Sequence, residues 1–200
     1  MLTTELVLGT HNPKKLKELQ HLFQGTPIQI DSLQDYPGAL EVEENGDSFQ
    51  ANAEKKASQQ ATHLQKWVIG EDSGICVDAL GGKPGIYSAR FAGDLATDEQ
   101  NNQKLIEQLQ GESKRSAHYV SHVALSDPQG RIVLNSEERC YGKIIDNPRG
   151  DAGFGYDPYF LVLEYDLTMA ELGNQVKSLI SHRAKAMRRF FHNFFSPIPD

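Results

Sequence analysis

The order of apolar patterns along the chain constrains its fold more than any other feature. Residues 5–9 and 28–30 are short apolar runs typical of buried strands, and apolar residues recur at helical spacing between them, over residues 13–24. A second helical stripe follows its expected cap Asp47, and a third short apolar run covers residues 67–69. Strands and helices therefore alternate in the first part of the chain, which is typical of an α/β fold.

The second half of the chain has a different pattern. Extended runs cover residues 117–126, 131–137 and 139–145, and the sequence at 127–130 between the first two is typical of a type I turn. A last helix is predicted from about Leu179. Antiparallel strands after alternating strands and helices predict an α/β fold with a mixed sheet. We see no linker or repeat, so we expect one elongated domain over residues 1–200, with two lobes and a central cleft.

The bulk composition excludes several classes of protein. The 200 residues carry a formal net charge of −7, whereas a general nucleic-acid binder is expected to be basic. No apolar run approaches the ~20 residues that span a bilayer, and residues 1–5 lack the basic start of a secretion signal. Cys76 and Cys140 match no zinc or disulfide framework. We therefore expect reduced thiols in the cytoplasm, no nucleic-acid partner and no membrane partner.

Two adjacent carboxylates, Glu71 and Asp72, follow the apolar run at 67–69, and the turn-prone pair Ser73-Gly74 comes next. We therefore expect the acidic pair at the carboxyl end of a strand, which is where ligands bind in open α/β sheets. Two carboxylates at such a place suit a hard divalent metal ion, or a water molecule that needs a general base. The alternative, with similar weight from these residues alone, is a strand end that turns into solvent.

Two predicted helices begin with cations, which is electrostatically unusual. The first carries Lys14, Lys15 and Lys17 in its first turns, and the last begins near His182 and Arg183. Cations at a helix N-terminus oppose the helix dipole, but together with backbone N–H groups they can hold an anion. For either helix alone, side chains that simply point into water are the simpler interpretation. The two together, beside an acidic pair, favour an anion site.

Lys56, Lys177 and one aromatic loop are further candidates for ligand binding. The loop at 153–158 places Phe154 between glycines, which suits stacking of its ring on a planar base. On composition alone, a tight turn that packs Phe154 into the core and lysines that are merely solvated are the simpler interpretations. The phosphate-loop, dinucleotide-binding and serine-hydrolase motifs are all absent from the chain.

Five sequence blocks follow one another in a fixed order and span nearly the whole chain. They are Thr10-His11-Asn12-Pro13-Lys14-Lys15-Leu16-Lys17-Glu18-Leu19, Glu44-Asn45-Gly46-Asp47-Ser48-Phe49 with Asn52-Ala53 and Lys56-Ala57, Glu71-Asp72-Ser73-Gly74 running on through Leu80 to Arg90, Gly153-Phe154-Gly155-Tyr156-Asp157-Pro158, and Lys177 with Ser181-His182-Arg183. Taken together, these blocks resemble the inosine triphosphate pyrophosphatase family, whose members are house-cleaning hydrolases of non-standard purine nucleoside triphosphates.

The resemblance implies Mg²⁺-dependent hydrolysis of ITP, dITP and XTP, cleaved between the α and β phosphates to give a monophosphate and pyrophosphate. It also implies a homodimer of elongated α/β subunits with a central nucleotide cleft between the lobes. Three places depart from the family pattern. His11 stands where a glycine is common, Glu71 occupies a position that varies among small and acidic residues, and Gln175-Val176 precede Lys177 where the family is often acidic and polar.

The resemblance also implies roles for individual residues. Asp72 is the expected general base and metal ligand, and Glu71 is its expected helper. The catalytic residues would be Asp72, Glu71 and Lys56, and the metal ligands Glu44 and Asp72 with Glu43 as an outer partner. The substrate-binding residues would be Thr10, His11, Asn12, Pro13, Lys14, Lys15, Ser73, Phe154, Gly155, Tyr156, Asp157, Lys177, His182 and Arg183.

Two other functions remain as alternatives. A pyrophosphatase for modified pyrimidine triphosphates would carry a serine-rich first block followed by two arginines, whereas this chain has Lys14 and Lys15. A non-catalytic nucleotide-binding protein on the same scaffold would be expected to lose an acid, yet Glu44 and Asp72 are both present. Both alternatives therefore rank below hydrolysis of purine triphosphates.

Overall fold

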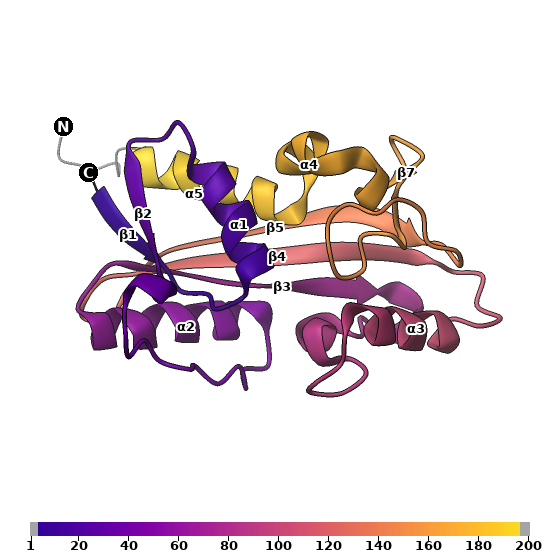
Figure 1. Ribbon diagram of the computed structural model, residues 1–200, viewed down its shortest axis with the longest axis horizontal. Helices are drawn as coiled ribbons and strands as arrows, with labels where there is room; N and C mark the ends of the chain where they lie inside the picture. The colour runs from indigo at the N-terminus through magenta and orange to yellow at the C-terminus, as the bar shows by residue number, and fades with distance from the viewer. Residues whose placement is uncertain (1–3, 197–200) are drawn as a thin grey trace. The chain divides into compact units, whose positions relative to one another are not determined.

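The computed structural model describes residues 4–196, so residues 1–3, on which the expectation of no secretion signal partly rests, lie outside it. Its elements (Figure 1) are β1 (Thr4–Leu8), α1 (Pro13–Phe23), β2 (Ile28–Ser32), η1 (Leu33–Asp35), α2 (Phe49–Leu64), β3 (Val68–Val77), η2 (Asp78–Leu80), η3 (Gly85–Arg90), α3 (Asp98–Gln108), β4 (Ser116–Ser126), β5 (Ile132–Ile144), β6 (Phe160–Val162), β7 (Leu167–Thr168), α4 (Met169–Ile180) and α5 (His182–Phe195).

The strands form a seven-stranded sheet in the order β2-β1-β3-β4-β5-β6-β7. β1 pairs in parallel with β2 and with β3, where Leu6 lies opposite Ile30 and Val7 lies opposite Val68. β6 pairs antiparallel with β5 and with β7. Parallel and antiparallel strands in one sheet confirm the predicted mixed α/β fold.

The described chain divides into two compact units, to which β3, β4 and β5 each contribute residues. Unit 1 runs to Asp72 and takes in Ser121–Glu138 and the chain from Lys185. Unit 2 consists of Ser73–Val120 and Arg139–Ala184.

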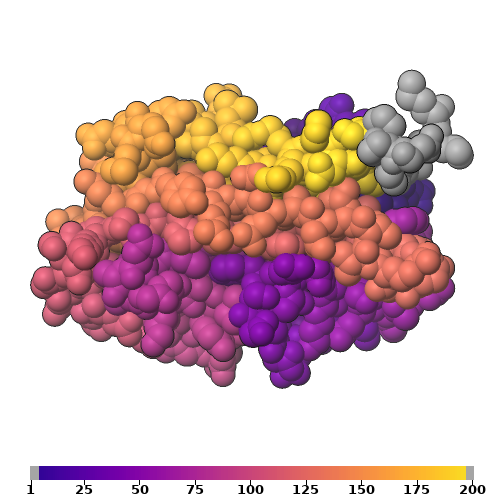
Figure 2. Space-filling view, turned by 180° about the vertical axis from the view of Figure 1, so that it is seen from behind, coloured from indigo at the N-terminus to yellow at the C-terminus, as the bar shows by residue number. Residues whose placement is uncertain are grey.

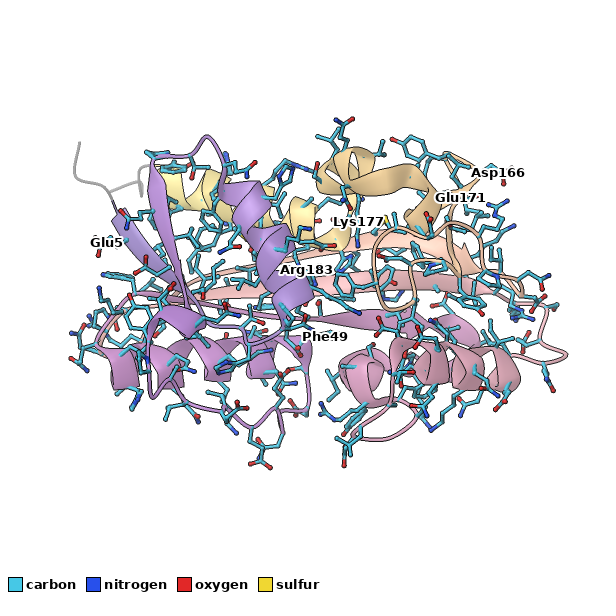
Figure 3. The ribbon with its side chains drawn as sticks, in the orientation of Figure 1. Glu5, Phe49, Asp166, Glu171, Lys177 and Arg183 are labelled. Carbon is cyan, nitrogen blue, oxygen red and sulfur yellow. The ribbon has the colours of Figure 1, made fainter. Side chains whose placement is uncertain are left out.

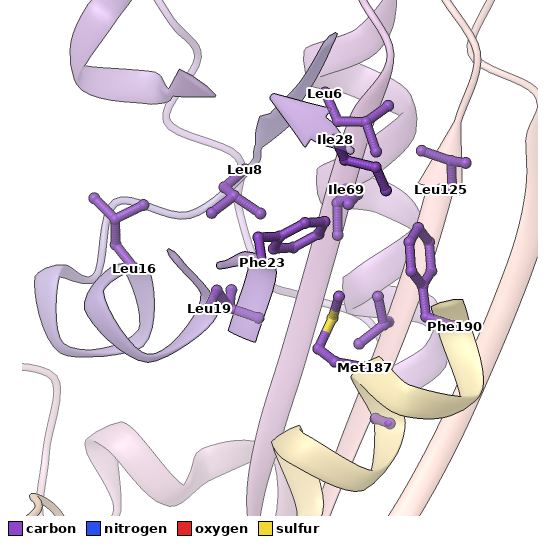
Figure 4. Close-up of a cluster of buried hydrophobic side chains, with 12 residues drawn as sticks. Leu6, Leu8, Leu16, Leu19, Phe23, Ile28, Ile69, Leu125, Met187 and Phe190 are labelled. Atoms are coloured by element: carbon purple, nitrogen blue, oxygen red, sulfur yellow. The ribbon is translucent and has the colours of Figure 1, made fainter. Parts of the chain in front are cut away.

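Unit 1 is a sheet covered on both faces by helices. Figure 1 shows α1 and α5 over one face and α2 over the other. Successive strand residues point to opposite faces, so Leu6 and Ile69 pack in a core with α1 and α5 (Figure 4), while Val7 and Val68 pack with Ala61 of α2. Each face of the unit 1 sheet therefore has its own apolar layer.

The last helix is fixed to β5 by polar contacts as well as by its aromatic face. Seen from behind, the yellow surface of α5 lies along the orange band of β5 (Figure 2). Ser136 Oγ donates to the carbonyl oxygen of Ala186 at 3.1 Å, and Arg189 pairs with Glu138 at 2.6 Å. These contacts hold α5 against β5 in unit 1.

Unit 2 has a separate core. Ile75 and Val77 of β3 pack there with Leu105 of α3, Phe160 of β6 and Met169 of α4. Capping boxes begin α3 and α4: Thr97 pairs with Gln100 and Thr168 with Glu171.

Three predicted boundaries were wrong. The cap of α2 is Ser48 rather than Asp47, because the Ser48 hydroxyl accepts the Ala51 N–H. The two runs predicted at 131–137 and 139–145 form the single strand β5. Glu138, at the predicted break, lies within the strand and pairs with Arg189 of α5. The last helix begins at His182, where its predicted first-turn cations lie, and not already at about Leu179, since extended Ser181 separates it from α4.

Within residues 4–196, no helix combines the length and apolar character needed to cross a bilayer. Cys76 and Cys140 are both thiols, as predicted.

Candidate active site

The acidic pair lies inside β3 and not at its end, so the predicted position was wrong. The strand continues through Ser73-Gly74 to Val77, and both carboxylates are buried, with 1% of Glu71 and 4% of Asp72 exposed. Ser73 and Gly74 do not turn, because the apolar residues after them enter the unit 2 core. Since adjacent strand residues point to opposite faces, the two acids belong to different groups of side chains.

Asp72 lies on the α2 face, in a network with Lys56, Glu44 and Asn52. Lys56 Nζ lies 3.3 Å from Asp72 Oδ1 and 2.9 Å from Glu44 Oε2. Asn52 Nδ2 donates to Asp72 Oδ2 at 3.1 Å. Gly70 lets α2 approach this closely, because a methyl group there would collide with the backbone of Ala53. The predicted residues Glu44, Lys56 and Asp72 are thus brought together.

The charges in this network shift one another's pKa values. Burial raises the pKa of Asp72, against the opposing attraction of Lys56 and Lys15. Burial also acts to raise the pKa of Glu44, but Lys56 and then Lys15 outweigh it and hold that pKa below its ordinary value. The pKa of Lys56 is raised despite burial, because the negative charges of Asp72, Glu44 and the more remote Glu71 stabilise its ammonium group. Lys56 therefore stays charged between the two carboxylates.

Glu71 points to the opposite face, toward α1. Lys15 Nζ lies 3.1 Å from Glu71 Oε2, and Ser121 Oγ donates to Glu71 Oε1 at 2.9 Å. Lys15 is half-buried, whereas Lys14 and Lys17 are exposed. Glu71 thus orients a lysine and lies apart from the Asp72 network.

The start of α1 is capped by its own sequence. Asn12 Oδ1 accepts the N–H groups of Lys14 at 3.0 Å and Lys15 at 3.2 Å, and the Leu16 N–H donates to the Asn12 carbonyl oxygen. Pro13 has no N–H group. An anion at this helix start therefore meets side chains rather than unbonded backbone N–H groups.

Three more predicted residues precede or flank this network. The Thr10 hydroxyl accepts the Asn12 N–H at 3.2 Å, and His11 Nε2 lies 3.0 Å from the Leu40 carbonyl oxygen. Glu43 is exposed and accepts a hydrogen bond from Asn45. Glu44, and not Glu43, thus contacts Lys56.

Asp157 is the centre of a second polar group, in unit 2. Lys177 Nζ lies 2.6 Å from Asp157 Oδ2, and both side chains are buried. The Phe154 N–H donates to Asp157 Oδ2 at 3.0 Å, and Tyr119 Oη donates to Oδ1 at 3.3 Å. Burial and then the Asp157 carboxylate raise the pKa of Tyr119 well above its ordinary value, so Tyr119 is a neutral donor.

The Phe154 ring lies among cations and not in the apolar core. Lys177 Nζ is 4.7 Å from its ring centroid and the Arg183 guanidinium carbon is 5.9 Å from it; Figure 3 labels both cations. Arg183 donates to Ser73 Oγ at 2.9 Å, and His182 stacks on Tyr119 at 4.6 Å. A half-buried ring with adjacent hydrogen-bond donors is a suitable platform for a planar base.

The loop that carries Phe154 is held by α3 and η3. The Gly155 N–H donates to Asp98 Oδ2 at 2.9 Å, and Asn102 Nδ2 donates to the Gly155 carbonyl oxygen at 2.9 Å. Tyr156 is buried, and its hydroxyl donates to the Ser88 carbonyl oxygen. Gly155 and Tyr156 therefore position the aromatic loop.

Sequence reasoning gave no role to several polar partners. Asn52 fell within a matched block, but nothing in the block showed that it contacts Asp72. Ser121 and Tyr119 carry a detectable signal, since both are polar residues on the face of β4 that otherwise carries the apolar side chains of Ala117, Val123 and Leu125. Asp98 and Asn102 carry none, because they contact Gly155 across more than fifty residues of sequence.

The Asp72 network fits a hard divalent cation. Among residues 4–196, no group of three or more His, Cys, Asp or Glu side chains lies close enough to hold a metal ion. Mg²⁺, however, commonly takes only one or two carboxylates and completes its shell with water and substrate phosphates. Glu44 and Asp72, which converge on Lys56 Nζ, offer such a pair of oxygen donors.

Comparison with known proteins places the chain in one family. The model of the Ham1 family matches residues 6–193. The dITP/XTP pyrophosphatase of Rhodopirellula baltica is 47% identical over 188 residues, which cover 93% of this chain and 90% of that protein. That of Geobacter sulfurreducens is 45% identical over 186 residues, covering 92% and 93% of the two chains.

Solved structures agree with the sequence comparison. The Ham1 protein of Staphylococcus aureus superposes with a TM-score of 0.86 at 36% identity, covering 96% of this chain and 98% of that one. The HAM1 protein of Coxiella burnetii gives 0.88 at 35% identity, with the same coverage. The sequence and fold together show that this chain belongs to the Ham1 family.

Proposed function

We propose that this protein hydrolyses the non-standard purine triphosphates ITP, dITP and XTP to the nucleoside monophosphate and pyrophosphate, and so removes them from the nucleotide pool. The observation that carries the proposal is the sequence similarity of this chain to proteins named dITP/XTP pyrophosphatases. Two of them are 47% and 45% identical to it over more than nine-tenths of its length. These relatives do not favour a pyrimidine substrate or a non-catalytic role.

The unit 1 residues are suited to a triphosphate. Lys14 and Lys15, with the turn at 10–13, would bind phosphate oxygens, and buried Lys56 would neutralise charge beside the carboxylates. Lys15 already pairs with Glu71, so the side chain is held in place before any substrate arrives. A preoriented cation loses less conformational entropy on binding than a solvated one.

Asp72 is suited to accept the proton of the attacking water. Its carboxylate is held by Lys56 and Asn52, beside Glu44, where an attacking water would lie close to the Mg²⁺ ion. Water would attack the α phosphorus in line with the bond to the β phosphate, and pyrophosphate would leave. Glu44 and Asp72 would hold Mg²⁺, with Glu43 as an outer partner, and the ion would stabilise the charge that develops on the phosphates.

The unit 2 residues are suited to the base. Phe154 would stack on the purine, while Lys177, His182 and Arg183, with Ser73 and the backbone near Asp157, would present donors to its edge. Hypoxanthine and xanthine carry the acceptor O6 where adenine carries a donor amino group. Donors left unpaired, or facing another donor, can discriminate by ~10⁴-fold or more.

The product identifies the reaction. With ITP and Mg²⁺, we expect IMP and pyrophosphate to form in equal amounts, measured by chromatography of the nucleotides and a pyrophosphate assay without added pyrophosphatase. Orthophosphate as the first product, with IDP, would show cleavage at the β–γ bond and contradict the proposal.

Phe154→Ala should raise KM for ITP by about tenfold and lower kcat less, because base stacking contributes ~1–3 kcal/mol. Phe91→Ala is the matched control, since Phe91 is also a half-buried ring in unit 2 and carries Lys104 at 4.8 Å. An unchanged KM in Phe154→Ala would assign the ring to packing alone.

The proposal includes a cytoplasmic homodimer. The family resemblance implies the dimer, and two cysteine thiols support a reducing compartment. Sedimentation of the purified protein at micromolar concentration should give twice the mass of one chain.

A further inference from the structure

We propose that Asn52 is a positioning residue that sets the separation of the two metal-binding carboxylates, Glu44 and Asp72. This inference rests on the proposed Mg²⁺-dependent function. It concerns a residue that touches neither the expected substrate nor the expected metal ion, and that acts through the two side chains on either side of it.

Both ends of the Asn52 amide are used. Nδ2 donates to Asp72 Oδ2 at 3.1 Å, and Oδ1 accepts the Gly46 N–H at 2.8 Å. Asn52 is 1% exposed, so water does not compete for these bonds. One side chain of α2 therefore ties Asp72 of β3 to the loop that carries Glu44.

Lys56 completes the arrangement one helical turn later. Residues four apart lie on one face of a helix, and Lys56 contacts the other Asp72 oxygen, Oδ1, as well as Glu44. Asn52 and Lys56 thus each hold one oxygen of Asp72. A metal ion would compete with the charged Lys56 for the carboxylate oxygens of Glu44 and Asp72. Asn52 is neutral and can keep its hydrogen bonds when a cation binds.

Gly46 shows how closely the loop is fitted to Asn52. A methyl group at Gly46 would lie 2.7 Å from Asn52 Oδ1 and 2.9 Å from the Ala51 Cβ atom. The loop would have to move away from α2, and Glu44, two residues earlier, would move with it. The backbone at Gly46 and the amide of Asn52 therefore define one junction.

Asn52→Asp tests the inference at constant size. The variant replaces the Nδ2 donor by a carboxylate oxygen that repels Asp72. Losing a partner that orients metal ligands commonly weakens metal binding ~10–100-fold. We expect the half-saturating Mg²⁺ concentration for turnover to rise by at least tenfold, while KM for ITP at saturating Mg²⁺ changes less than threefold. In thermal unfolding with a non-hydrolysable triphosphate, the Mg²⁺ concentration that gives half of the maximal stabilisation should rise by the same factor.

Asn101→Asp is the matched control. Asn101 is a buried asparagine in α3 whose amide also bonds on both sides, to the Ala92 N–H at 2.8 Å and the Ala89 carbonyl oxygen at 3.1 Å. It should lose stability but keep the wild-type Mg²⁺ dependence. Gly46→Ala leaves Asn52 intact and should raise the half-saturating Mg²⁺ concentration in the same way. This variant replaces Asn52→Asp in the test if Asn52→Asp does not fold.

The outcomes separate the inference from the function. A wild-type protein that releases pyrophosphate only with Mg²⁺, together with Asn52→Asp and Gly46→Ala proteins of unchanged Mg²⁺ dependence, overturns the inference alone. Equal Mg²⁺ shifts in Asn52→Asp and Asn101→Asp also overturn it, because a general loss of rigidity would then explain both. A wild-type protein without Mg²⁺-dependent pyrophosphate release contradicts the proposed function itself.

Discussion

Asp72→Asn should lower kcat for pyrophosphate release from ITP by ~10³-fold or more, while the protein stays folded. General-base catalysis contributes ~10²–10⁴-fold, and the substitution also removes a ligand charge for Mg²⁺. The asparagine has nearly the same shape, and its single oxygen can still accept from Lys56, but its NH₂ group then faces the Asn52 donor in place of the second carboxylate oxygen. Steady-state kinetics with ITP and the thermal unfolding midpoint would measure the two effects separately.

The fold should survive this change because burial opposes the charge on Asp72. Its pKa is raised in the folded state, so its contribution to stability is present below the unfolded-state pKa and is lost as pH rises through the folded-state pKa. A neutral asparagine avoids that loss at neutral pH. Near-wild-type turnover in the folded variant would remove Asp72 from the role of base.

Glu71→Gln is the informative comparison for Asp72→Asn. Glu71 is the adjacent buried carboxylate, but it faces Lys15 and Ser121 on the other side of the sheet. Its loss should raise KM through Lys15 and leave kcat within about tenfold of wild type. A loss of kcat equal to that of Asp72→Asn would show that the two acids act together.

Lys56→Met should destabilise the protein by about 3–5 kcal/mol at pH 8, because it leaves the buried Asp72 carboxylate and the partly exposed Glu44 carboxylate without their shared cation. It should also lower kcat, since the charge beside the triphosphate is lost. Urea unfolding, analysed by linear extrapolation, measures the free energy of unfolding. Lys55, the adjacent lysine on α2, donates to Asn45 at the surface. The control Lys55→Met should therefore change the free energy of unfolding by less than ~0.5 kcal/mol.

The pH dependence distinguishes charge from packing. In the wild type the raised pKa of Lys56 means that its stabilisation is present below the ordinary lysine pKa and is lost only as pH rises through the folded-state value. Without Lys56, the pKa values of Glu44 and Asp72 rise, so protonation at low pH relieves the repulsion. The stability deficit of Lys56→Met should therefore be smaller at pH 5 than at pH 8. A deficit that does not change with pH would indicate a packing defect.

The sequence predicted those elements whose signals are local. Asn12 and Pro13 mark the start of α1, and Thr97 with Gln100 marks that of α3, because capping depends on residues within one turn. β3 was predicted too short because Ser73-Gly74 has the composition of a turn. What keeps these residues extended is the central place of β3 between β1 and β4 and the burial of Ile75 and Val77, and both are tertiary.

The sequence named the residues of the candidate site but not the contacts between them. The blocks contained Glu44, Lys56, Asp72, Lys177 and Asp157, since their family resemblance is a property of sequence alone. The two separate environments of Glu71 and Asp72 follow from strand alternation, because β3 continues through both residues. Partners such as Asn52 depend on how closely α2 approaches the sheet, which the glycine at 70 permits and no local pattern reports.

The most direct test of the central claim is kcat/KM for pyrophosphate release from ITP, dITP, XTP, GTP, ATP and the common pyrimidine triphosphates, all with Mg²⁺. We expect ITP, dITP and XTP to exceed ATP by about 10⁴-fold, with the nucleoside monophosphate as the other product. Comparable values for ATP and ITP, or a pyrimidine triphosphate as the best substrate, would contradict the account.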